Sequence, residues 1–186
     1  MRPAEQPAPS RNEVAGALAA TAEELGTDRL DVCGQRVCEL RAWELAASAA
    51  PAVLDRGHED SLVARVVEEL EPLVERVNEV SRRPRSALWR GAGDRVAQAL
   101  VLAGEEAGAP ERGRAAAARA LSVPGPLAGR LRIEQLVIDG RVEQLHLRNG
   151  CCLWHRVPGE PKCSSCPLLD PGERGPRVVA EREESG

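Results

Sequence analysis

Apolar residues recur at helical spacing through the first two thirds of the chain, which predicts a mainly helical region. One helix is expected to run from a cap at Ser10 to a stop at Gly26. Its buried face would be formed by Val14, Leu18, Ala22 and Leu25. The clearest stripe, which Asp60 or Ser61 can cap, is formed by Leu62, Val63, Val66, Val67, Leu70, Val74 and Val77. Pro72 lies inside this stripe and predicts a kink or two abutting helices there.

Other segments of the helical region carry weaker signals. Residues 31–38 are interpreted as a strand or strand-turn segment, and the short helix after them is expected to end at Pro51. Gly91 and Gly93 disfavour a helix, so the next one is expected to begin near Asp94. A further helix is expected over residues 111–121, before the Pro-Gly-Pro sequence at 124–126.

The pattern changes from helical to β-like at residue 131. Residues 131–138 and 141–147 are rich in alternating apolar positions, and Asp139-Gly140 between them is a strong signal for a two-residue hairpin turn. The fold class expected is therefore α+β, a helix-rich domain with a C-terminal β-hairpin that leads into a cysteine-rich loop.

These signals divide the chain into four parts. Residues 1–10 are rich in Pro and Ala and are expected to be a disordered N-terminus. Residues 11–130 form the helical region, and residues 131–169 form the hairpin with the cysteine-rich motif. Residues 170–186 are rich in Pro, Gly and charge, and are expected to be a disordered tail.

Composition and charge limit the classes of function. A chain of 186 residues suits one domain, and its formal charge of −4 argues against a nucleic-acid partner, which favours a basic surface. The first residues contain no apolar stretch typical of a signal peptide, and no segment has the length and hydropathy of a transmembrane helix. We therefore expect a soluble, cytoplasmic protein.

Four of the six cysteines lie within sixteen residues, as Cys151, Cys152, Cys163 and Cys166. Three explanations are open: disulfide bonds, a structural zinc site and an iron–sulfur cluster. Disulfides are rare in the cytoplasm, where clustered thiols more often bind metals. Cys163 and Cys166 have the spacing of zinc ligands, but adjacent side chains such as those of Cys151 and Cys152 leave an extended backbone on opposite sides. A binuclear cluster divides four thiolates between two irons and tolerates this arrangement.

The arrangement Cys-Cys, ten residues, Cys, two residues, Cys, Pro resembles the C-terminal 2Fe–2S motif of FhuF-like ferric-siderophore reductases. The Arg156-Val157-Pro158-Gly159 sequence inside it and Pro167 after it belong to the resemblance. The resemblance implies a 2Fe–2S cluster whose ligands are the cysteines Cys151, Cys152, Cys163 and Cys166. It also implies one-electron reduction of a ferric siderophore, with electrons from a reductant such as a ferredoxin or a flavin reductase.

Two alternatives remain beside this function: a 2Fe–2S electron carrier without a siderophore site, and a structural zinc module. For the reductase, a cleft is expected between the cysteine loop and the helical part, with candidate wall residues Arg85, Trp89, Arg90 and Arg156. Arg148, Arg156 and Lys162 are expected to place positive charge near the cluster. Cys33 and Cys38 are expected to be buried in the core rather than bound to metal.

Overall fold

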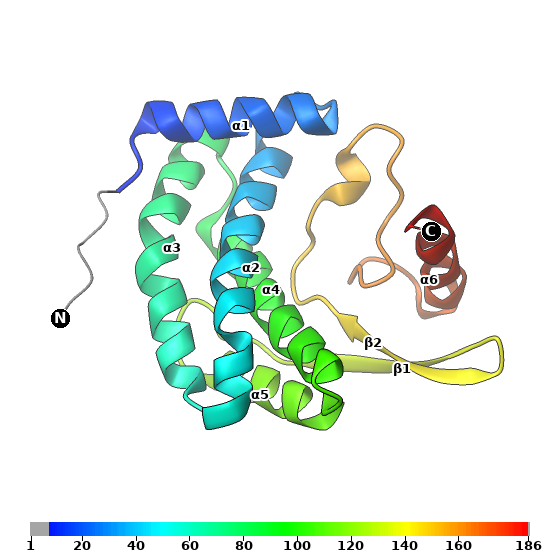
Figure 1. Ribbon diagram of the computed structural model, residues 1–186. Coiled ribbons are helices and arrows are strands. Elements are labelled where there is room, and N and C mark those ends of the chain that lie inside the picture. The colour runs from blue at the N-terminus through cyan, green and yellow to red at the C-terminus, as the bar shows by residue number, and fades with distance from the viewer. Residues whose placement is uncertain (1–7, 186) are drawn as a thin grey trace.

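The computed structural model describes residues 8–185, and the expectation of disorder for residues 1–7 lies outside them. Five helices form a bundle to which a hairpin and a C-terminal helix are attached (Figure 1). The elements, in chain order, are α1 (Arg11–Leu25), α2 (Leu30–Arg56), α3 (Glu59–Ser81), α4 (Arg85–Glu106), α5 (Pro110–Ser122), β1 (Arg132–Ile138), β2 (Arg141–Leu147), the 3₁₀ helix η1 (Trp154–Arg156) and α6 (Pro171–Ser185). The predicted α+β class is confirmed.

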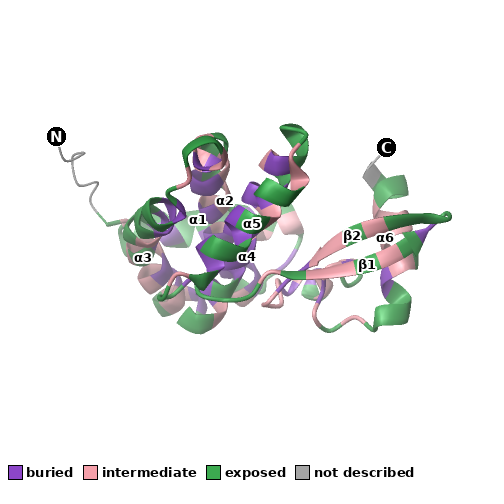
Figure 2. Cartoon of the chain, turned by 90° about the horizontal axis from the view of Figure 1, so that it is seen from below, coloured by how far each residue is buried: buried purple, intermediate pink, exposed green. Residues whose placement is uncertain are grey.

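The core lies within the bundle, where α2 packs extensively against both α4 and α3 while α1 crosses their ends (Figure 1). Buried residues concentrate in the bundle, whereas the hairpin is mostly half-buried or exposed (Figure 2). The predicted stripe of α3 forms part of this core, and Val66, Leu70 and Val74 are fully inaccessible. Trp89 is also buried in the core. Small side chains fill most of the remaining positions, which lets the helices approach closely.

The prediction of a strand over residues 31–38 is wrong, because this segment is the first part of α2. Its buried face includes Gln35 and Glu39, and these two polar residues interrupt the apolar pattern by which a buried helix is recognised. The helix also continues through Pro51 to Arg56. Cys33 and Cys38 lie in α2 with no exposed surface, as expected.

Helices are also continuous at two other positions, where the sequence predicts a kink or two abutting helices in one case and a later start in the other. α3 continues through Pro72, and α4 begins at Arg85 rather than near Asp94. The glycines of α4 permit close packing: a Cβ atom at Gly91 would lie 1.9 Å from Nε2 of Gln35. Tertiary packing thus outweighs the low helix propensity of glycine at this site.

Replacing Gly104 with Ala is expected to destabilise the protein by about 1–3 kcal/mol, because α4 and α5 cross at this residue. A Cβ atom there would lie 2.6 Å from Cα of Gly113, and backbone cannot move aside cheaply. Gly16→Ala is the control, since nothing lies within 4 Å of its new Cβ atom and the change should add about 0.5–1 kcal/mol through helix propensity. Urea unfolding followed by circular dichroism measures both, and equal effects would contradict the close approach.

The predicted hairpin is confirmed. Its strands pair antiparallel from Arg132 opposite Leu147 to Ile138 opposite Arg141. Asp139 and Gly140 form the connection and both have positive φ, 52° and 76°. This conformation is the one that a two-residue turn of the Asp-Gly type requires.

The prediction of a disordered tail from residue 170 is wrong, because Pro171–Ser185 form α6. This helix packs against β1, where the buried Arg174 forms an ion pair of 2.5 Å with Glu134. Arg182 forms a second ion pair, with Glu143 of β2. The composition of the tail suggested disorder, but these long-range ion pairs join it to the hairpin. No helix among the described residues is long and apolar enough to cross a membrane.

Candidate metal centre

A carboxylate in α4 fixes the chain just before the cysteine loop. The two carboxylate oxygens of Asp94 accept hydrogen bonds from the backbone N–H groups of Asn149 (2.8 Å) and Gly150 (3.0 Å). Oδ1 also accepts one from the Asn149 side chain at 2.8 Å. Three donors on one buried carboxylate set the position of the backbone that enters Cys151, and they join the loop to the bundle core.

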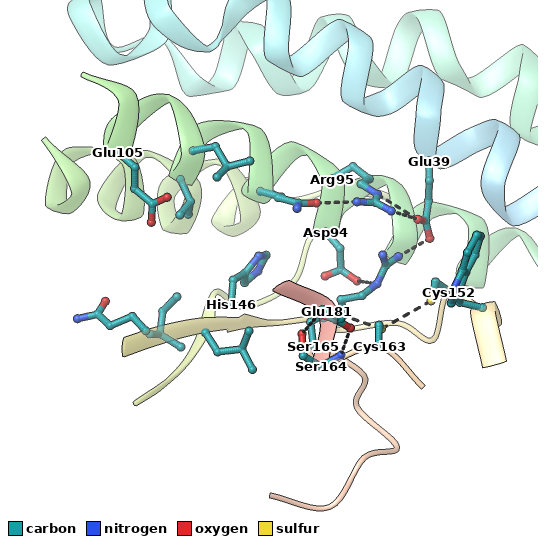
Figure 3. A pocket seen from close by; sticks show the side chains of 18 of the residues that line it. Glu39, Asp94, Arg95, Glu105, His146, Cys152, Cys163, Ser164, Ser165 and Glu181 are labelled. Atoms are coloured by element: carbon teal, nitrogen blue, oxygen red, sulfur yellow. Dashed lines mark hydrogen bonds and ion pairs between the residues drawn. The ribbon is translucent and has the colours of Figure 1, made fainter. Parts of the chain in front are cut away.

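Beside this carboxylate lies a buried ion network that joins α2, α4 and the loop (Figure 3). Glu39 forms ion pairs with Arg95, at 3.1 Å, and with Arg148. The Glu39 and Arg148 side chains are only 2% and 9% exposed, so water screens the pair little. Burial opposes the charge on Arg148, but the charges of Glu39, Cys152 and Asp94 together outweigh it and raise the pKa of Arg148. The guanidinium therefore stays charged at the entrance to the loop.

The first cysteine pair is followed by a sharp turn. Leu153 adopts a left-handed conformation, with φ of 63°, and the chain then enters η1. Leu153 and Val157 pack against Val32 of α2 in a small apolar cluster. Arg83, in the linker between α3 and α4, donates a hydrogen bond of 3.0 Å to the Cys151 carbonyl. The loop is thus attached to the bundle on both sides of the first cysteine pair.

Cys152 and Cys163 are brought together from the two ends of the loop, with their sulfurs 3.9 Å apart. A tetrahedral metal that binds two thiolates at about 2.3 Å holds the sulfurs about 3.8 Å apart, so this pair fits a shared metal ion. The hydrogen bond with the Cys163 thiol, assisted by the charge of Arg148, lowers the pKa of Cys152. One thiol of the pair is therefore poised to become the thiolate that metals bind.

The sulfurs of Cys151 and Cys166 each accept a hydrogen bond from a nearby backbone N–H group. Cys151 Sγ accepts a hydrogen bond of 3.4 Å from the Leu153 N–H, and Cys166 Sγ accepts one of 3.4 Å from the Leu168 N–H. Among residues 8–185, no group of three or more His, Cys, Asp or Glu side chains is arranged to hold a single ion. A binuclear cluster takes two thiolates per iron. Its site therefore requires pairs of neighbouring sulfurs rather than three or more ligands around one ion.

Of the three cations expected near the sulfurs, Arg148 is the one whose charge acts on Cys152 and Cys163. Arg156 instead forms an ion pair of 3.2 Å with Asp31, and Lys162 donates to the Leu168 carbonyl. Arg83, which the sequence analysis did not single out, is the cation that acts on Cys151. It lies in a run of arginines, and nothing in that run distinguishes it from its exposed neighbours.

A cavity of about 570 Å³ lies between the bundle and the hairpin, and two of the four cysteines contribute to its wall (Figure 3). One side is formed by α4, from Asp94 to Glu105, and the other by both strands of the hairpin. Cys152 and Cys163 line the cavity, whereas Cys151 and Cys166 do not. The volume is in the range of small-molecule sites.

The four candidate wall residues are wrong, because none of them lines this cavity. Trp89 is buried in the bundle core, and Arg85 forms ion pairs with Glu71 and Glu75 of α3. Arg90 is exposed and bonds to the carbonyl of Ser86 in its own helix, and Arg156 pairs with α2. The cavity uses another face of α4, which the sequence could not identify without knowing where the hairpin packs.

The residues that the sequence analysis missed share one property: they are polar side chains at positions facing the interior or the cavity. They are Arg36, Glu39, Arg95, Gln98 and His146. Burial lowers the pKa of His146, so its imidazole is neutral at pH 7. A polar residue within an apolar helical face is the one signal that could have identified Glu39.

Comparison with known proteins bears on the loop alone. Residues 148–168 match the family described as the FhuF 2Fe–2S C-terminal domain. No curated protein and no solved structure matches the chain significantly. The match confirms the resemblance and its cofactor, a 2Fe–2S cluster, and begins at Arg148, the residue that joins the loop to Glu39. The chain is an iron–sulfur protein that carries a FhuF-type 2Fe–2S domain in its cysteine loop.

Proposed function

We propose that this protein reduces ferric siderophores by one electron, and that Cys151, Cys152, Cys163 and Cys166 are the ligands of its cluster. Cys152 and Cys163 would share one iron, as their separation of 3.9 Å suits, and the other two cysteines would share the second. The proposed division of the chain is a helical substrate-binding region over residues 11–130 and a cluster region over residues 131–169.

The observation that carries this proposal is that the cavity wall includes two of the motif cysteines. A bound 2Fe–2S cluster supplies a single electron, which is the number that converts Fe(III) into Fe(II). Siderophore oxygens hold Fe(II) much less firmly, so this electron releases the metal. The protein contributes the site: α4 and the hairpin enclose the chelate, and Cys152 and Cys163 keep the gap to the cluster short.

No residue in the cavity has to act as a nucleophile or to form a covalent bond in this reaction. The electron would come from a separate reductant, such as a ferredoxin or a flavin reductase, in the cytoplasm. An electron carrier without a siderophore site would share the cluster but would not need the cavity.

The test is to reduce the protein chemically without oxygen, add a ferric siderophore and trap Fe(II) with a coloured chelator. Reoxidation of the cluster in step with Fe(II) formation is expected. Leu102→Trp should slow this reaction several-fold, because Leu102 lines the cavity and the larger ring would obstruct part of it. Leu40→Trp is the control, since Leu40 is exposed to the same extent (38% against 37%) but does not line the cavity.

Failure with hydroxamate, catecholate and citrate chelates, while the cluster remains intact and reducible, would contradict the reductase and leave the electron carrier. Equal rates for the two Trp variants would show that reduction takes place elsewhere on the surface.

A further inference from the structure

The cavity wall contains four arginines, and three of them already have acidic partners. Arg95 and Arg148 both bind Glu39, and Arg114 binds Glu111. Arg36 is the exception: its side chain has no hydrogen bond or ion pair with any described residue. Its Nε atom is buried without a partner, which is costly for a donor of a charged group. A ligand in the cavity would meet the terminal nitrogens of this guanidinium, and oxygen acceptors on it would balance the charge that no described residue pairs.

Arg36 lies at the end of the cavity next to the cysteine loop. It is in α2, one helical turn after Val32 and almost one turn before Glu39, and all three residues line the cavity. Val32 packs against Leu153, directly after the first cysteine pair. A molecule that binds Arg36 in the cavity would therefore lie beside Cys152.

The carboxylates of the cavity do not cancel this charge. Glu39 and Asp94 are engaged by arginines and by backbone N–H groups, and Glu181 accepts hydrogen bonds from the backbone and hydroxyl of Ser164. Glu105 lies eleven residues beyond Asp94 in α4, which is about 16 Å along the helix. The neutral His146 stands between them (Figure 3) and adds no charge of either sign.

We propose that this cavity selects ferric chelates that carry net negative charge, and that Arg36 binds their peripheral oxygens. This inference rests on the proposed function, and it names both the chemical class of the substrate and the residue that recognises it. A guanidinium suits the role because it directs several N–H donors at carboxylate or phenolate oxygens in one plane. A neutral tris-hydroxamate chelate gives Arg36 no charge to pair with and should bind more weakly.

The test measures binding apart from electron transfer. Gallium(III) forms chelates of the same charge as iron(III) but is not reduced by the cluster. Calorimetric titration of the cluster-loaded protein with gallium(III) tris-catecholate is expected to give at least tenfold tighter binding than with the neutral gallium(III) tris-acetohydroxamate. Arg36→Gln should weaken binding of the tris-catecholate about tenfold or more and leave binding of the neutral chelate nearly unchanged.

Arg90→Gln is the matched control, because Arg90 is an exposed arginine outside the cavity, and it should bind both chelates like the unchanged protein. Equal binding of the two chelates, or equal losses in the Arg36 and Arg90 variants, would overturn the inference. Reduction of ferric chelates without preference for charge would support the reductase and contradict the role of Arg36. Tight binding of gallium(III) tris-catecholate without reduction of its iron(III) counterpart would support the role of Arg36 and contradict the reductase.

Discussion

Replacing Cys152 with Ser is expected to remove most of the iron, sulfide and visible absorption from protein purified without oxygen. Cys152 is adjacent to one motif cysteine and lies 3.9 Å, sulfur to sulfur, from another. A hydroxyl is far less acidic than a thiol and is a poor substitute for the thiolate that a cluster requires. Iron and sulfide analysis, with the visible and paramagnetic resonance spectra, measures the loss.

Cys38→Ala is the control for this experiment. Cys38 is a buried thiol in α2 that contributes only packing, and burial raises its pKa to about 12, which keeps it protonated. The variant should lose some stability through the small cavity created but retain its full spectrum. Retention of full iron and sulfide by the Cys152 variant would show that Cys152 is not a ligand.

Glu39→Gln is expected to destabilise the protein by up to about 3–5 kcal/mol, because the buried Arg148 would lose its nearer carboxylate and keep only Asp94, 3.8 Å away. Arg148 is almost fully buried and depends on this carboxylate, which also pairs with Arg95. The amide of Gln has nearly the same shape as the carboxylate, so the loss would report on charge rather than on packing. Urea unfolding measures the change, and the rate of cluster loss should rise with it because Arg148 directly precedes the loop.

Glu44→Gln provides the comparison, since Glu44 forms an exposed ion pair with Arg41 at 3.2 Å in the same helix. Exposed pairs of this kind contribute about 0–1 kcal/mol. A loss at Glu39 as small as that at Glu44 would mean that water reaches Arg148 and replaces the carboxylate.

The parts of the fold that the sequence predicted are those with local signals. Asp139-Gly140 between two alternating segments specifies the hairpin, and the apolar stripe from Leu62 to Val77 specifies α3. The four cysteines were likewise conspicuous from their spacing alone. The fold class follows from such local features, and the cofactor follows from the family resemblance that the cysteine spacing carries.

The parts that the sequence did not predict depend on contacts between distant residues. The first part of α2 was missed because its buried face carries polar residues such as Glu39, whose partner Arg148 lies 109 residues later. α6 was missed because its ordering depends on Glu134 and Glu143 of the hairpin. The cavity wall could not be assigned because it depends on which face of α4 the hairpin meets.

The attachment of α6 has a consequence for handling the protein. Glu181 in this helix accepts two hydrogen bonds from Ser164, which directly follows Cys163. Much of what holds α6 to the hairpin is ionic, and the pair between Arg182 and Glu143 is partly exposed to solvent. Dissolved salt screens such pairs, with a range of about 10 Å at 0.1 M and about 3 Å at 1 M. The ionic strength of a buffer therefore acts on the second half of the cysteine motif, and concentrated salt during purification would shorten the lifetime of the cluster.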